Sequence, residues 1–146
     1  MFTVMRSMNV ISRCQAIFRA AAGIEGLAPC HHTILLALCR EPGRSQEELA
    51  RDIRLNKSSI ARALALLEEQ GFVECKTNAR DKRCLLVYPT ARATEVLPRV
   101  RAVAEEWNGI LTEDIDPQEL MTFYAVLARM EERARSATEG MGVEKA

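Results

Sequence analysis

The hydrophobic period of this 146-residue chain changes at Gly71, and that change limits what the chain can fold into. Residues 57–70 carry apolar side chains at helical spacing. Residues 72–77 alternate between apolar and polar side chains, and residues 84–88 are a second run of strand-forming residues after a polar, turn-rich segment. The pattern predicts a helix that is followed directly by a β-hairpin.

A shorter helix is expected just before this one. Ser45-Gln46-Glu47-Glu48 is a capping box, because the Ser45 hydroxyl can accept the Glu48 amide while the Glu48 carboxylate accepts the Ser45 amide. Arg54-Leu55-Asn56 then forms a three-residue turn, with Asn56 as the N-cap of the next helix. Helix, turn, helix and hairpin in this order predict a winged helix-turn-helix, although the spacing alone also allows an arbitrary helical hairpin.

Longer helices flank this unit, so the predicted fold class is mainly α with a small β-hairpin wing. A largely apolar helix is expected over residues 5–22, a second from Pro29 to just before Pro42, a third from Thr90 to about residue 111, and a last one from Asp116. The last helix carries an aromatic and aliphatic stripe made of Leu120, Phe123, Tyr124, Leu127 and Met130. Residues 139–146 are predicted to be a disordered tail.

Charge is unevenly distributed along the chain. Twenty basic residues balance twenty acidic ones, but residues 44–92 hold ten Lys and Arg against seven Asp and Glu, a net charge of +3. Residues 105–119 contain six acidic residues and no basic one. The predicted winged helix is therefore the basic part of the chain, which is what a nucleic-acid partner requires.

Cysteine usage and hydropathy exclude several classes of protein. The five cysteines include no C-x-x-C pair and the two histidines are adjacent, so no zinc-finger spacing exists, and no metal or other cofactor is expected. Most of the cysteines are expected to be buried, reduced thiols, with Cys14 or Cys30 as a redox sensor in the alternative. The longest stretch without a charged residue is 14 residues, shorter than a membrane span, and no secretory signal is visible, so a cytoplasmic location is expected.

Four segments, in order, resemble the MarR family of bacterial winged-helix regulators. They are the capped short helix (residues 43–50), the Lys-Ser-Ser start of a recognition helix (residues 55–64), the Leu-Glu-Glu-Gln-Gly-Phe-Val junction (residues 67–73) and the Asp-Lys-Arg wing (residues 78–83). The similarity extends over about residues 10–137. Two positions depart from the family pattern: Ala93 stands where a glycine is common, and Leu27-Ala28-Pro29 lacks a hydroxyl cap.

The resemblance implies a triangular homodimer that binds double-stranded DNA at a pseudo-palindromic operator, as a transcriptional repressor. Residues 1–28 and 91–138 would form the dimerisation helices, and residues 29–90 the DNA-binding winged helix. A small aromatic or anionic effector would bind between these parts and shift the dimer away from its DNA-competent state.

DNA contacts are expected from three places. The start of the recognition helix (Lys57, Ser58, Ser59, Ala61, Arg62) would enter the major groove, and the start of the preceding helix (Ser45, Gln46) would hold a phosphate. On the wing, Arg80, Lys82 and Arg83 are basic, and the resemblance implies that Arg83 enters the minor groove while Asp81 orients it through a bidentate pair. The alternatives are a solvated helix surface and an ordinary hairpin ion pair.

The effector site is the weakest part of the pattern. Cys30, His31, His32 and Trp107 are candidates to line it, although buried core histidines and a core tryptophan are common. No enzyme is expected, because the chain has no Gly-rich phosphate loop and no nucleophile elbow. A winged helix that binds protein without DNA remains the other alternative.

Overall fold

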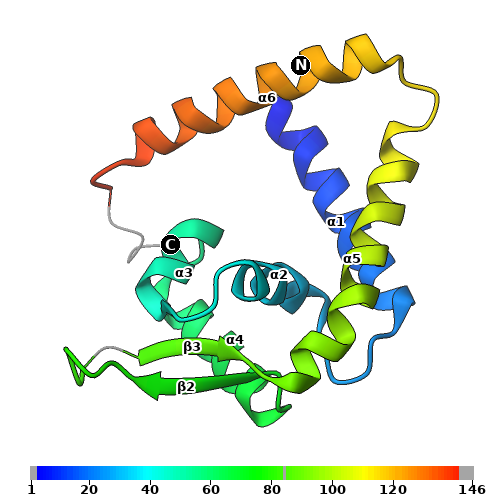
Figure 1. The fold of residues 1–146 in the computed structure, drawn as a ribbon. Coiled ribbons are helices and arrows are strands. Elements are labelled where there is room, and N and C mark those ends of the chain that lie inside the picture. The colour runs from blue at the N-terminus through cyan, green and yellow to red at the C-terminus, as the bar shows by residue number, and fades with distance from the viewer. Residues whose placement is uncertain (1–2, 84, 142–146) are drawn as a thin grey trace.

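The computed structural model describes residues 3–83 and 85–141 of the chain. Its outline is triangular: one long helix, α6, forms one side, α5 follows a second, and the sheet with its short helices fills the opposite corner, while α1 runs from beneath α6 and crosses α5 (Figure 1). In chain order the elements are α1 (Val4–Ala22), the 3₁₀ helix η1 (Pro29–His31), α2 (His32–Arg40), β1 (Arg44–Ser45), α3 (Gln46–Ile53), α4 (Lys57–Glu69), β2 (Val73–Thr77), β3 (Leu85–Pro89), α5 (Ala91–Thr112) and α6 (Pro117–Thr138). The predicted helices, the hairpin and their order are confirmed.

Side chains at the helix starts act as the sequence predicts. The Ser45 Oγ accepts the Glu48 amide at 3.1 Å, and the Glu48 Oε2 accepts the Ser45 amide at 3.2 Å, which completes the capping box of α3. The Asn56 Oδ1 accepts the Ser59 amide at 2.7 Å and caps α4. Thr90 caps α5 in the same way. Each cap satisfies a backbone donor that the first helical turn leaves open.

The sheet has three antiparallel strands in the order β1-β3-β2, so the expected hairpin gains a two-residue strand that the sequence pattern does not predict. Val87 of β3 lies between Arg44 of β1 and Cys75 of β2. Gly43 precedes β1 with a φ of 81°, and a Cβ there would lie 3.1 Å from the Tyr88 ring. Glycine is therefore required where β1 joins the hairpin.

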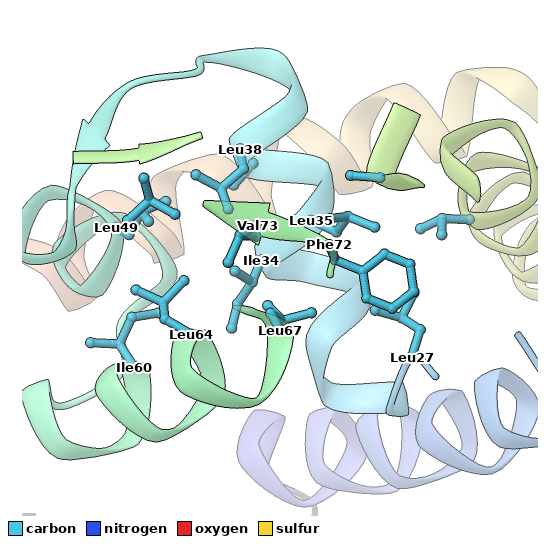
Figure 2. Packing of buried hydrophobic residues seen from close by; sticks show 14 of the residues in the cluster. Leu27, Ile34, Leu35, Leu38, Leu49, Ile60, Leu64, Leu67, Phe72 and Val73 are labelled. Atoms are coloured by element: carbon cyan, nitrogen blue, oxygen red, sulfur yellow. The ribbon is translucent and has the colours of Figure 1, made fainter. Parts of the chain in front are cut away.

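The hydrophobic core lies in the winged helix and in the segments just before and after it. Every buried hydrophobic residue of the described chain lies between Ile24 and Val100. Figure 2 shows Ile60, Leu64 and Leu67 along one side of α4, beside Ile34 of α2 and Val73 of β2. Helices α1 and α6, by contrast, contain no buried residue.

The prediction that most cysteines are buried is wrong for this chain. Cys14 and Cys30 are exposed, and Cys39 and Cys75 are only half-buried, while Cys84 lies outside the described residues. Cys14 is exposed because it lies on α1, which this chain's own core does not cover. Burial raises the pKa of Cys39 and, with Glu68, raises the pKa of Cys75 to about 11, so these two thiols stay protonated.

The structure describes only part of the predicted C-terminal tail. Residues 142–146 of the predicted tail lie outside the described residues, and residues 139–141 are exposed. Among the helices that the structure describes, none is long and apolar enough to cross a bilayer.

Candidate nucleic-acid interface

Three segments that are separate in the sequence meet at one cleft of about 490 Å³. We call it the wing cleft; it is lined by Ser45, Gln46, Glu47, Lys57, Asp81, Arg83 and Leu85. The first three come from the start of α3, Lys57 begins α4, and the others come from the wing. The two helix starts and the wing therefore form one surface.

The start of α3 contributes a fixed backbone rather than a free hydroxyl. Ser45 is buried, and its side chain is held in the capping box. Gln46 is half-buried and Glu47 is exposed. The Glu47 Oε1 lies 3.6 Å from the Lys57 Nζ, so an exposed ion pair joins the starts of the two helices across the cleft.

The start of α4 presents the predicted residues in two groups. Lys57, Ser58 and Arg62 are exposed, whereas Ser59 and Ala61 are half-buried. The Ser58 Oγ donates a hydrogen bond to the Asn56 Oδ1 at 2.9 Å, and the same oxygen accepts the Ser59 amide. A single side chain, Asn56, thus caps the helix and orients the Ser58 hydroxyl.

The tip of the wing is held by two local turns. The Asn78 Oδ1 accepts the Arg80 amide at 3.0 Å, and the Asp81 Oδ1 accepts the Arg83 amide at 3.0 Å. In the described part of the chain the Asp81 carboxylate bonds the Arg83 backbone, and the expected bidentate pair with the Arg83 guanidinium is absent. Arg80, Lys82 and Arg83 are all exposed. The wing therefore presents three basic side chains to solvent.

A residue that the sequence analysis missed ties this surface together. Arg44 of β1 is nearly buried, with its side chain 12% exposed, and its guanidinium pairs with Asp52 of α3 and lies 3.7 Å from Glu41. It links the sheet to α3 through contacts that no local periodicity encodes. A basic residue beside a predicted capping box was the only signal in the sequence.

The four residues expected to line an effector site differ in their exposure and in their contacts. His31 and His32 are 6% and 1% exposed, while Cys30 is exposed. Trp107 packs on Phe18 with ring centroids 5.3 Å apart. None of the four lines the wing cleft.

The histidines lie where α1 meets α2. The Arg19 Nη1 of α1 donates to the Pro29 carbonyl and to the Thr33 Oγ1, both at 3.3 Å. Burial lowers the pKa of His31, and burial together with the nearby Arg19 and His31 lowers the pKa of His32 to about 4. With this pKa the His32 imidazole is neutral at pH 7, and its Nε2 is buried.

A second, apolar surface lies far from the wing. We call it the apical groove; it has a volume of about 590 Å³ and its apolar lining is Met8, Ile11, Leu111, Ile115, Leu120, Phe123, Tyr124 and Leu127. These side chains come from α1, the end of α5, the turn that follows it and α6. Within residues 3–83 and 85–141 there is no cluster of three side chains that could hold a metal ion.

Comparison with known proteins gives a consistent result. Residues 23–83 match the MarR family. The transcriptional regulator YybA of Bacillus subtilis, of the helix-turn-helix type and itself uncharacterised, is 29% identical over 96 residues. That match covers 66% of this chain and 64% of the length of YybA, which is less than two thirds of the relative.

Solved structures match over nearly the whole chain. The crystal structure of MarR is 29% identical, has a TM-score of 0.84, and the match covers 94% of this chain and 95% of that one. A MarR-family regulator from Listeria monocytogenes, solved with a 26mer DNA, has a TM-score of 0.87 at 22% identity, with 94% and 92% of the two chains covered. YybA and the Listeria protein are both described as regulators of transcription, which is the class of function expected from the sequence.

Proposed function

Since residues 23–83 match the MarR family and the crystal structure of MarR matches over 94% of this chain, we propose that the chain is a MarR-family, sequence-specific regulator of transcription that binds double-stranded DNA. The wing cleft is the observation that carries this proposal. It joins the starts of two helices to a wing with three exposed basic side chains. A protein partner would not need basic residues at both places.

In this proposal each part of the surface has its own role. The start of α4 enters the major groove, where Arg62 can donate two hydrogen bonds to a guanine edge. Arg83 enters the neighbouring minor groove, and Arg80 and Lys82 hold phosphates. The free amides at the start of α3, fixed by Ser45, face a phosphate. Asp81 acts by fixing the backbone at Arg83, rather than by holding the guanidinium.

The proposal includes a homodimer that reads a pseudo-palindromic operator. Helices α1 and α6 bury none of their own residues, and the apical groove exposes large apolar side chains such as Phe123, which is 55% exposed. A patch of this kind calls for a partner, and a second copy would cover both faces by symmetry. Residues 1–28 and 91–138 would then be the dimerisation helices, and residues 29–90 the DNA-binding region.

In this proposal the dimer occupies a promoter and thereby represses transcription. The protein then acts in the cytoplasm, where the DNA is. A small anionic effector that releases the dimer is part of the same proposal, and the specific observation in its favour is the cluster of Arg19, His31 and His32 at the joint between α1 and α2. Redox sensing is the alternative form of regulation. It is favoured by the exposure of Cys14 and Cys30.

The test is a titration of the protein into duplex DNA from upstream of its own gene and into scrambled duplex, at several salt concentrations. A dimer that makes about 6–10 phosphate contacts should lose about 10³–10⁵ in affinity between 50 and 200 mM salt, and a specific site should bind about 10³-fold more tightly than scrambled DNA. Arg83→Ala should weaken specific binding by about 1–3 kcal/mol. Arg99→Ala, which removes an exposed arginine from α5 and not from the wing cleft, is the matched control.

Three outcomes separate the alternatives. Salt-steep, selective binding that Arg83→Ala weakens and Arg99→Ala leaves unchanged would support the proposal. Salt-steep binding without selectivity would place the operator elsewhere. Absence of binding to either duplex would favour a winged helix that binds protein.

A further inference from the structure

The outward face of α4 is short and chemically mixed. Opposite the buried Ile60, Leu64 and Leu67, the residues at helical spacing are Ser58, Arg62 and Ala65, all exposed. They follow one another at intervals of four and three residues, so they form one row along the helix. This row is the part of α4 that a DNA groove would meet first.

Ser58 is prepared to accept a hydrogen bond. Its hydroxyl proton is donated to the Asn56 Oδ1 at 2.9 Å, and Asn56 is itself fixed by the Ser59 amide. The exposed Ser58 oxygen is therefore left to accept a hydrogen bond from a bound partner. In the major groove only adenine and cytosine offer one, through their amino groups, whereas a phosphate oxygen offers none.

Arg62 can only donate hydrogen bonds, unlike Ser58, and Ala65 can make only apolar contacts. A guanidinium only donates, and the base edge with two acceptors side by side is guanine, through O6 and N7. Ala65 offers a methyl group, and Leu66 beside it is 49% exposed, so this end of the row is apolar. The apolar feature of the major groove is the thymine methyl group.

Acidic side chains limit the row at its far end. The Glu68 Oε2 is turned towards β2, where it accepts the Cys75 amide at 3.0 Å, and Glu69 is exposed at the last position of α4. Carboxylates there are repelled by phosphates, so contact ends near Ala65. At a rise of about 1.5 Å per residue, Ser58 to Arg62 spans about 6 Å and Arg62 to Ala65 about 4.5 Å, which is one to two base-pair steps each.

We infer that α4 reads a half-site in which a guanine lies between a base with a major-groove amino group and a thymine methyl. Ser58 accepts from the adenine or cytosine, Arg62 binds the guanine, and Ala65 contacts the methyl group. The inference rests on the proposed function and deepens it, because it names the class of operator that this chain selects.

The experiment starts from a library of random duplexes, from which the full-length protein selects its own half-site. The selected duplex is then made with thymine replaced by uracil inside the half-site, and separately with 7-deazaguanine in place of the central guanine. Replacement of thymines outside the half-site by uracil is the matched control. Affinities are compared for the wild-type protein and for Ala65→Gly.

A loss of one contacted methyl group should weaken binding about fourfold, and loss of the guanine N7 about fivefold or more. Uracil in the flanks should change nothing. In Ala65→Gly the preference for thymine over uracil should disappear while the effect of 7-deazaguanine stays, a pattern that misfolding of the variant would not produce.

Failure of this inference differs from failure of the proposed function. If a half-site is selected but lacks the guanine, or if uracil binds as well as thymine, the reading by Ser58, Arg62 and Ala65 is overturned and the regulator stands. If no sequence is selected at all, the proposed function itself fails, and the inference with it.

Discussion

The winged helix and the helical frame formed by α1, α6 and the end of α5 both carry many apolar side chains, but they bury them differently. The winged helix covers its apolar side chains with its own elements, and residues such as Phe72, Leu38 and Leu49 are fully buried. In the frame, Ile17 and Met121 are 70% and 67% exposed. The difference shows that one region covers its own apolar side chains, whereas the other leaves them exposed, as the proposed homodimer requires.

Replacing a phenylalanine by alanine in each region should give the largest difference between the two regions. Phe72→Ala removes a fully buried ring, and we expect it to lower the free energy of unfolding by about 3–5 kcal/mol. Phe123→Ala, at a position 55% exposed in one chain, should leave the unfolding of the winged helix nearly unchanged and weaken self-association. Urea denaturation and light scattering measure the two effects. Equal destabilisation by both variants, with no change in mass, would contradict the division.

The free energy of unfolding should depend on pH through His32, which lies at the joint where α1 meets α2. Because burial lowers the pKa of His32 to about 4, the unfolded chain binds a proton between about pH 4 and 6.5 that the folded chain does not. The free energy of unfolding should therefore be highest above pH 6.5 and fall by up to about 3 kcal/mol as the pH drops towards 4.

His32→Gln isolates this contribution. Urea denaturation at pH 7 and pH 4.5 should show a smaller acid loss in the variant than in the wild-type protein. Parallel losses in the two proteins would mean that His32 titrates normally in the folded state, and that the joint is open to water.

The expected difference in unfolding free energy between the two regions is smallest for the helix caps. Asn56→Ala removes the cap of α4, which packs against the core, and should lower the free energy of unfolding by about 1 kcal/mol. Thr3→Ala removes the equivalent cap of α1, where the Thr3 Oγ1 accepts the Arg6 amide at 3.3 Å on an exposed first turn. We expect a smaller loss there, because that turn can fray without disturbing the core. Thermal unfolding followed by circular dichroism compares the two, and equal losses would indicate that α1 is as firmly held as α4.

Local chemistry explains what the sequence could predict. The capping box at Ser45, the cap at Asn56 and the change of period at Gly71 each depend on neighbours within a few residues, and each prediction is confirmed. The wing cleft was predictable only as separate pieces, since its members are brought together by the packing of α3, α4 and the hairpin.

Features that depend on distant contacts could not be predicted. Strand β1 has two residues, too few for a period, and exists because Arg44 and Ser45 meet β3 about forty positions later. The guanidinium of Arg44 finds Asp52 and Glu41 only in the folded chain. We expected buried cysteines because cysteine is buried in most proteins. That average does not apply to a helix such as α1, which contains no buried residue in this chain.

The order β1-β3-β2 also has a consequence for how the wing avoids sticking to other sheets. One edge of the sheet is only two residues long, and the other, β2, carries the exposed charges Glu74 and Lys76, which lie 3.9 Å apart. Short edges and charged edges both discourage the addition of a further strand from another molecule. If the hairpin projects into solvent to reach DNA, as proposed, these edges protect it against polymerising with its own copies while no DNA is bound.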